Sequence, residues 1–510
     1  MSSLVDNILQ QLDFHPLSVT LLATVAHNNR WDNGRLTREW AQYRTGVLQT
    51  EHNRSLAATI ELSLASPMFR ELGPEARGLL GVVAFFPQGI NENNIDWLFP
   101  TKNIFSWLSP AIPKRTDIFD KFCVLSLTYR CEGFITMLAP LRDYLGPKDP
   151  ASSPLLLATK KRYFSRLSVH IDPDKPSFKA ARWITSEDVN VEHLLDVFTT
   201  TDARSSDTWR ACRHFMQHLR WHKPRLVMLG PKIERLSDKH RTKPQCLVEL
   251  SELFSSVGND VQRKKLLVHT LKLWRERADH AHVAETLQFL AEANRCLGLH
   301  EEGIKQAKEA VEIFKRRNNR LGQGQSNQRL AQLLYDDQQL EAAEEATSLA
   351  INLLSNNGDQ LPLKHRRSIT VCRCYRLLGN ICYSKGEMGK AISHFKTALE
   401  IASSFDWHNE HFWIHHSLAK LFFGNNGFDD AHAHVECAKS HTINNAYNLG
   451  RAMELQAQFW HEERKFEEAK SEALHAVDVY EKVGAIKDVE RCRVLLRDIE
   501  MAVGGSIICD

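Results

Sequence analysis

The second half of the chain carries a recurring pattern of apolar, small and polar positions. In the stretch YRLLGNICYSKGEMGKAISHFKTALE, apolar and small residues recur every three or four positions before Gly386 and again after it. That spacing marks one face of a helix, and a glycine between two such segments is typical of a tight turn. The stretch therefore predicts two antiparallel helices. The pattern consists of Tyr375, Leu378, Gly379 and Cys382 in the first helix, and Ala391, Phe395 and Ala398 in the second. We expect the small Ala391 to let the second helix pack against Gly379.

The same skeleton recurs along the chain and predicts six helix pairs over residues 244–500. The equivalent positions 263, 303, 343, 391, 431 and 469 are 40, 40, 48, 40 and 38 residues apart. The longest step contains the polar stretch 356–360, which we expect to be a surface loop. Stacked helix pairs form an α-solenoid with a concave binding face, so the fold class is mainly α. The first-helix markers of the other copies are Leu250-Ser251, Leu290-Ala291, Leu330-Ala331, Leu418-Ala419 and Met453-Ala457.

These helix pairs resemble the tetratricopeptide (TPR) repeat, which has small residues at its eighth, twentieth and twenty-seventh positions. The spacing here exceeds the usual 34 residues, so the helices or turns must be longer than standard. In the TPR family, the second, fifth, ninth and twelfth positions face the concave side. The resemblance thus predicts a groove for a protein or peptide that carries carboxylates. Its residues would be Arg373, Arg376, Asn380, Tyr383, Trp413, His416, Lys420, Phe423, Arg451 and Gln458.

The run KGEMGKAIS invites a competing interpretation as a phosphate-binding loop. A Walker loop, G-x-x-x-x-G-K-[ST], would need a first glycine where Ser384 stands. It would also need a hydroxyl after Lys390, where Ala391 stands, and a preceding strand rather than a helix. The run is therefore interpreted as an inter-helix turn.

The first half of the chain reads differently. Residues 4–66 have helical spacing, a buried helix is expected to end at Pro87, and the segment 124–138 alternates like a β-hairpin with its turn at Glu132-Gly133. Helices followed by a hairpin are the ingredients of a winged helix. The expected domains are an ARC-like helical subdomain (1–68), a winged-helix-like domain (69–148), a helical connector (149–243), the TPR solenoid (244–500) and a tail (501–510).

Two sequence segments of the first half resemble NB-ARC and related STAND signalling ATPases. LDFHPLSVTLLATVAHNNRW looks like their Gly-Leu-Pro-Leu-Ala helix, and FDKFCVLSLTYRCEGFITMLAPLRDYL looks like their winged-helix segment, which ends in a Met-His-Asp motif. With the repeats, the whole chain resembles the fungal NB-ARC/TPR proteins. The resemblance implies that Pro16 would contact the adenine side of a bound nucleotide.

The chain departs from that family where nucleotide chemistry is concerned. The Met-His-Asp position reads Met137-Leu138-Ala139, so the histidine that would touch the ADP β-phosphate is missing, and a leucine cannot donate that hydrogen bond. The sequence also contains no Walker motif. ADP or ATP is expected only if a P-loop domain lies upstream or on another chain, and otherwise we expect no cofactor.

Composition and charge narrow the remaining function classes. The chain has 510 residues, 43% hydrophobic and 25% charged, with a net charge of +3. This near balance gives no support for binding to nucleic acid or membrane, and no segment reads as a signal peptide or membrane span. The eleven cysteines include no CxxC pair, which favours reduced thiols and a cytoplasmic location.

The chain has two groups of closely spaced histidines and one basic stretch, which raise the question of a metal site or a nucleic-acid site. His214, His218 and His222 share one helical spacing, and His408, His411, His415 and His416 lie close together, but no HExxH motif or cysteine pair supports a zinc site. We expect solvated or interface histidines and no bound metal. The basic stretch 210–243 predicts a solvated connector or a contact for an acidic partner rather than a nucleic-acid site.

The sequence therefore favours a non-catalytic interaction protein. Its solenoid would bind a protein or peptide in a STAND-like signalling context, of an innate-immunity or incompatibility type, and the first half would hold an intramolecular or oligomeric contact. No arrangement of Ser, His, Asp or Cys with activating neighbours predicts an enzyme. The alternative is an ADP/ATP-regulated STAND switch whose nucleotide subdomain lies elsewhere.

Overall fold

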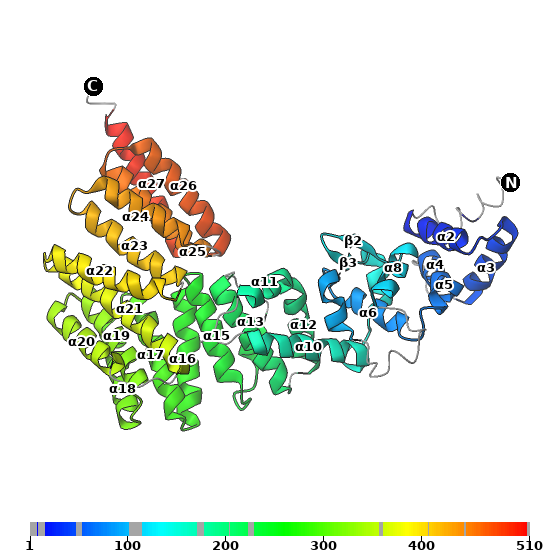
Figure 1. The fold of residues 1–510 in the computed structure, drawn as a ribbon, viewed down its shortest axis with the longest axis horizontal. Coiled ribbons are helices and arrows are strands. Elements are labelled where there is room, and N and C mark those ends of the chain that lie inside the picture. Colours follow the sequence, from blue (N-terminus) through cyan, green and yellow to red (C-terminus); the bar gives the residue numbers. More distant parts are fainter. Residues whose placement is uncertain are drawn as a thin grey trace. The chain divides into compact units, whose positions relative to one another are not determined.

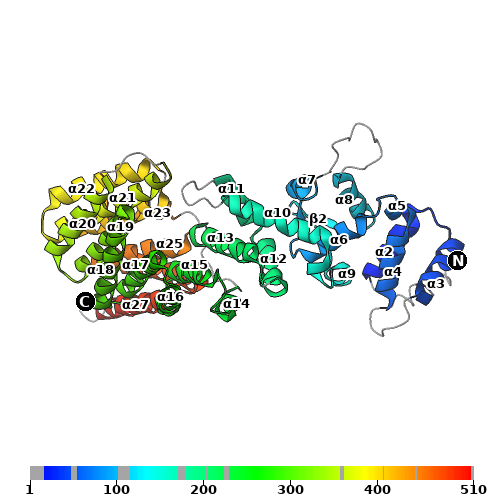
Figure 2. The same ribbon diagram turned by 90° about the horizontal axis from the view of Figure 1, so that it is seen from below.

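The computed structural model is mainly α-helical, as the sequence pattern predicts (Figures 1 and 2). It describes residue 8 and residues 16–46, 54–100, 115–170, 178–202, 204–222, 229–355, 361–405, 407–442 and 445–506. The predicted loop 356–360 lies outside the described residues. The chain divides into two compact units, one comprising Met1–Leu167 with Ser186–Thr208 and the other Ser168–Thr185 with Trp209–Asp510. The expected five-part division stays a prediction.

The first unit is built from helices around a small antiparallel sheet. The sheet has the order β1-β3-β2, and Ile135 of β3 pairs with Ile90 on one side and Arg130 on the other. The predicted hairpin is therefore confirmed. Its elements are α2 (Pro16–Asn28), α3 (Asn33–Gly46), α4 (Arg54–Ala65), α5 (Pro67–Arg70), α6 (Ala76–Phe85), β1 (Ile90–Asn91), η1 (Glu92–Asn94), α7 (Ile95–Leu98), α8 (Arg115–Val124), β2 (Tyr129–Cys131), β3 (Phe134–Thr136), α9 (Ala139–Leu145), η2 (Pro150–Ser152), α10 (Pro154–His170) and α12 (Asp188–Thr201).

Backbone conformation explains the two tight points of this sheet. Glu132 and Gly133, between β2 and β3, have φ of 51° and 79°, as the predicted turn requires. Gly89, before β1, has φ of 81°, and a Cβ there would lie 2.1 Å from the Ile135 carbonyl oxygen. Only glycine allows the two strands to approach this closely.

A buried polar cluster joins the sheet region to helices of the predicted connector. The Glu187 carboxylate accepts hydrogen bonds from Asn94 (2.7 Å), Tyr163 (3.0 Å) and Asn190 (2.9 Å). The Asn190 amide also donates to the carbonyl of Gly89 at 3.0 Å. Buried polar groups are tolerated when they are satisfied in this way. As a result α10 and α12 belong largely to the first unit, although both fall in the sequence interval 149–243.

The second unit contains the six predicted helix pairs and one further helix (Figure 1). Before the pairs come α11 (Phe178–Ser186), α13 (Ser206–His222) and α14 (Gly230–Arg235). The pairs are α15 (Lys243–Ser256) with α16 (Asp260–Glu276), α17 (His280–Cys296) with α18 (His300–Arg316), α19 (Arg320–Asp336) with α20 (Leu340–Ser355), α21 (Leu361–Ser384) with α22 (Met388–Ser403), α23 (His408–Phe423) with α24 (Phe428–Ser440), and α25 (Ala446–Glu462) with α26 (Phe466–Val483). The last helix is α27 (Ile486–Ser506). Most of these helices have 16 or 17 residues, which accounts for the long repeat.

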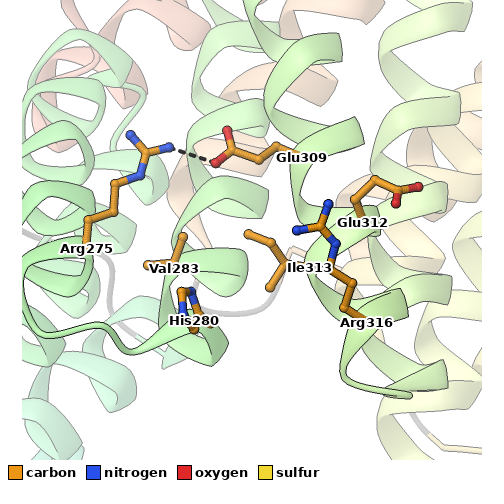
Figure 3. A pocket seen from close by; sticks show the side chains of 7 residues that line it. All are labelled: Arg275, His280, Val283, Glu309, Glu312, Ile313 and Arg316. Carbon is orange, nitrogen blue, oxygen red and sulfur yellow. Dashed lines mark hydrogen bonds and ion pairs between the residues drawn. The ribbon is translucent and has the colours of Figure 1, made fainter.

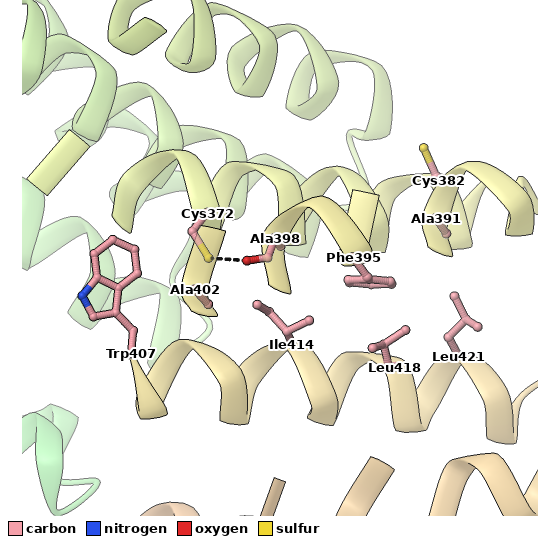
Figure 4. Close-up of a cluster of buried hydrophobic side chains, with 10 residues drawn as sticks. All are labelled: Cys372, Cys382, Ala391, Phe395, Ala398, Ala402, Trp407, Ile414, Leu418 and Leu421. Carbon is pink, nitrogen blue, oxygen red and sulfur yellow. Dashed lines mark hydrogen bonds between the residues drawn. The ribbon is translucent and has the colours of Figure 1, made fainter. Parts of the chain in front are cut away.

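The small residues of the pattern are the contact points inside each pair. Ala391 and Ala398 of α22 are fully buried in an apolar cluster that also includes Ile414 and Leu418 of α23 (Figure 4). The thiol of Cys372 on α21 donates to the Ala398 carbonyl oxygen at 3.3 Å. One apolar cluster therefore joins α21 and α22 to the next pair.

The KGEMGKA run is a turn between α21 and α22, as predicted. Gly386 has φ of 78°, which favours glycine, and the exposed Lys390 pairs with Glu387 at 3.0 Å. We expected Ala391 to face Gly379, but the ring of Phe395 fills that place. A Cβ at Gly379 would lie 2.7 Å from this ring.

Two glycine substitutions should therefore have opposite effects on stability. Gly379→Ala should lower the free energy of unfolding by about 1–3 kcal/mol, because the buried Phe395 ring must move. Gly389→Ala changes an exposed position of α22, where nothing lies within 4 Å of the added methyl, and should raise the free energy of unfolding by about 0.5–1 kcal/mol. Urea denaturation of both variants measures the difference, and equal effects would contradict this packing.

No helix among the described residues is both long and apolar enough to cross a membrane.

Candidate functional site

The first helices of the pairs form the inner layer of the solenoid. α17, α19, α21 and α23 each contact the first helix of the next pair, and α25 contacts the last helix, α27. Within the described chain, no second helix makes comparable contact with the next second helix. Helices on the inside of a curved stack lie closer together, so the first helices line the concave face.

Five of the predicted groove residues form one cluster across three inner helices. The indole of Trp413 on α23 lies between two guanidinium groups, that of Arg376 on α21 at 6.0 Å and that of Arg451 on α25 at 5.0 Å from the ring centroid. The His416 ring lies 5.7 Å from the indole centroid. Lys420 follows one turn after His416, and its charge acts on that imidazole. We call Arg376, Trp413, His416, Lys420 and Arg451 the cation cluster.

The cation cluster brings several positive charges close together. Burial, and then the surrounding cations, holds the pKa of His416 well below its usual value. Lys420 is exposed, but desolvation and then the charge of Arg451 lower the pKa of its amine. The carboxylate that acts on Arg376 is Glu410, which is paired with Arg373. The carboxylate that acts on Lys420 and Arg451 is Glu454. Glu454 binds Arg491 at 2.6 Å and the Tyr480 hydroxyl at 2.9 Å. Among the described residues, no carboxylate forms an ion pair with any of the three cations of the cluster.

The other predicted groove residues lie on the same helices but have different neighbours. Arg373 forms an ion pair with Glu410 at 2.7 Å. The Phe423 ring stacks on Phe459 with centroids 4.0 Å apart. Tyr383 packs against the α21–α23 core cluster, and its hydroxyl lies against Gly424. Asn380 and Gln458 are half-buried, and their role in partner binding stays a prediction.

The STAND resemblance relates two positions to nucleotide binding, Pro16 and Leu138, where Leu138 replaces the expected histidine. Pro16 is the first residue of α2, and its side chain lies outside the described residues. Leu138 precedes α9 with 43% of its side chain exposed.

Sequence reasoning missed a series of ion pairs along the inner face. Glu252 and Arg263, 2% and 3% exposed, pair at 2.9 Å. Arg295 binds Glu292 at 2.8 Å and Asp336 at 2.7 Å. The repeat register could have indicated these pairs. Glu252 and Glu292 occupy the ninth position of earlier copies, and Arg295 occupies the twelfth. These ion pairs lie on earlier helices than the cation cluster.

A hollow lies on the second unit, at helices α16, α17 and α18 (Figure 3). Its volume is about 350 Å³. Arg275 of α16 faces Glu309 of α18 across it, and Glu312 and Arg316 also lie on α18. Arg275 and Glu309 are already paired at 2.8 Å. Because its charges balance, the hollow offers less to a charged ligand than the cation cluster does.

The residues of the basic stretch 210–243, and the histidines at positions 214 and 218 within it, contact other residues of the second unit. Arg213 lies 3.9 Å from Glu249, and the Lys243 amine binds Asp238 at 2.8 Å. His218 shares a hydrogen bond with Thr185 at 3.3 Å, and burial lowers the pKa of His214 to about 4. The His222 side chain lies outside the described residues. The histidines of α23 belong to a separate cluster.

No family model and no curated protein matches the chain. Among solved structures, it is similar to a STAND protein with a tetratricopeptide repeat sensor from Pyrococcus horikoshii, at 14% identity and a TM-score of 0.45, over 96% of this chain and 69% of that one. It is also similar to a Rap protein complexed with Competence and Sporulation Factor (14%, TM-score 0.42, 68% and 99%). A third is the apo form of the quorum sensor NprR from B. thuringiensis (13%, TM-score 0.38, 67% and 97%). At these TM-scores the likeness does not decide what this chain binds.

Proposed function

We propose that this chain is a non-catalytic interaction protein whose inner face binds an acidic peptide or protein segment at the cation cluster. The observation that carries the proposal is the placement of Arg376 and Arg451 beside Trp413 and of Lys420 near Arg451. None of the three cations is in an ion pair with a carboxylate among the described residues. Like charges held together in a partly desolvated place oppose folding. A partner that brings carboxylates would relieve this repulsion on binding.

The chemistry of the cation cluster also suggests how such a segment would be held. Guanidinium groups bind carboxylates through two parallel hydrogen bonds, and the Lys420 amine adds a more adaptable donor. Trp413 supplies a flat apolar surface for a neighbouring side chain, and aromatic residues flanked by arginines are typical of binding hot spots. We therefore expect a segment in which Asp or Glu side chains, or a C-terminal carboxylate, stand next to an apolar residue.

The signalling context belongs to the same proposal. The resemblance of the two first-half segments to STAND proteins supports a role as the sensing half of such a protein. The nucleotide-switch alternative requires ADP to bind this chain. Equilibrium dialysis of the purified chain with ADP separates the two, since retention at micromolar concentration would favour the switch over a pure scaffold.

The binding proposal is tested by selection from a random peptide library on the purified chain. We expect enrichment of Asp and Glu beside an apolar residue, and loss of that enrichment with Lys420→Glu. Lys396→Glu, on the exposed side of α22, is the matched control with the same charge change. Enrichment of basic or purely apolar peptides, or selection unaffected by Lys420→Glu, would refute the proposal.

A further inference from the structure

Five histidines come together between α23 and α24, away from the cation cluster. His408, His411 and His415 lie on α23, His434 lies on α24, and His441 follows the end of α24. All five are half-buried. The Nδ1 atoms of His408 and His441 are 3.2 Å apart, and those of His415 and His434 are 3.0 Å apart. Sequence reasoning found only the α23 members, because the other two come from the neighbouring helix.

We propose that His411, His415 and His441 bind a divalent transition-metal ion of the zinc type. One ring nitrogen from each lies within 4.8 Å of those of the other two. Zinc bonds to imidazole nitrogen at about 2.0–2.1 Å, so tetrahedral ligand atoms stand roughly 3.3 Å apart. A modest contraction would bring the three nitrogens to that separation. His411 and His415 also have the one-turn spacing by which two helical histidines bind the same zinc ion.

The other two histidines, His408 and His434, are placed to orient the rings of the proposed ligands His441 and His415. Two neutral imidazoles at 3.0 Å form a hydrogen bond only if one ring donates and the other accepts. When Nδ1–H of His415 donates to His434, the lone pair of His415 is on Nε2 and is available to a metal. Nδ1 of His408 can likewise accept a hydrogen bond from Nδ1–H of His441. A ligand histidine that donates its other N–H to a neighbour is the usual arrangement around zinc.

The proposed ligand side chains must rotate to bind an ion, and they are accessible from solvent. The rings of His411 and His441 are nearly parallel (12°), as are those of His415 and His441 (7°). Binding therefore requires rotation about χ2, a torsion with a broad energy profile. Because the side chains are half-exposed, an ion can enter from solvent.

A metal here would fix α23 against α24. The opposite side of α23 carries Trp413, His416 and Lys420 of the cation cluster. The metal proposal does not rest on the peptide-binding proposal, since it concerns a separate set of side chains.

The test uses the full chain, freed of any histidine tag and treated with a chelator, and isothermal titration with Zn²⁺ alone. We expect one ion to bind with micromolar or tighter affinity and to raise the melting temperature. His415→Ala and His441→Ala should each abolish this site, whereas His475→Ala, an exposed histidine of α26, should leave it unchanged.

A spectroscopic measurement keeps the test valid if a variant unfolds. Cobalt added to the unmodified chain should give the intense visible bands of tetrahedral coordination, and zinc should displace them. Failure of the unmodified chain to bind either ion, or equal zinc binding by folded His415→Ala, would overturn the proposal.

Discussion

Arg376→Glu combined with Lys420→Glu should lower the affinity for the selected acidic peptide at least about 100-fold. The two changes replace attraction with repulsion at two positions of the cation cluster. Losing a partly desolvated charge contact costs about 2–5 kcal/mol, and roughly 2.7 kcal/mol corresponds to 100-fold in Kd. Isothermal titration with the peptide measures the effect.

The matched control makes the same change of charge on the outer layer. Lys308→Glu with Lys396→Glu alters exposed residues of α18 and α22, and should leave the affinity within about threefold. A loss of affinity as large as that of the inner pair would mean that overall charge, rather than the cation cluster, governs binding.

Removing one charge from the cation cluster should lower the affinity for the peptide without lowering the stability of the fold. Lys420→Met should weaken peptide binding while leaving the free energy of unfolding unchanged or slightly higher, because its pKa is lowered in the folded chain. A residue present only for structure would lose both together. This pattern is expected where a site is maintained for a ligand at some cost to stability.

Glu252→Ala should destabilise the solenoid by about 3–5 kcal/mol. Glu252 is almost completely buried between Arg263 and Arg220. Removing it leaves the buried Arg263 guanidinium with only the longer contact to Asp260 at 3.4 Å, and the loss of one partner of a buried pair costs much more than the net value of the intact pair. Glu302→Ala, which breaks an exposed pair with Lys264, should change stability by no more than about 1 kcal/mol. Chemical denaturation followed by circular dichroism compares the two.

The pH dependence of the Glu252 effect follows from its ionisation. Burial opposes its charge, but Arg220 and Arg263 outweigh burial and lower the pKa of the carboxyl. An unfolded glutamate titrates near about 4.3, so the stabilisation is fully present above that pH and is lost as the pH falls through the folded pKa. The stability difference between the unmodified chain and Glu252→Gln should therefore shrink below about pH 4.3. A constant difference would show that charge is not responsible.

The sequence predicted the helix pairs and the hairpin because both are encoded locally. Gly386 between two amphipathic segments, and Glu132-Gly133 between alternating residues, specify turns without knowledge of distant contacts. The inner-face register likewise placed Arg376, Trp413 and Arg451 on one surface.

Contacts between helices could not be predicted in the same way. The Phe395 ring, rather than Ala391, faces Gly379 because side-chain direction and helix rotation decide which residue reaches across. The pairing of Arg373 with Glu410, and the approach of His441 to His411, join residues about 30 positions apart or more. Such groupings depend on how one pair packs on the next, which periodicity alone does not specify.

The most direct test of the central claim is photocrosslinking with the selected acidic peptide. The peptide carries a photoreactive group next to its carboxylates, and mass spectrometry identifies the linked residues of the full chain. Binding at the cation cluster predicts links to the inner helices α21, α23 and α25. Links confined to the hollow of Arg275 and Glu309, or to the first unit, would contradict it.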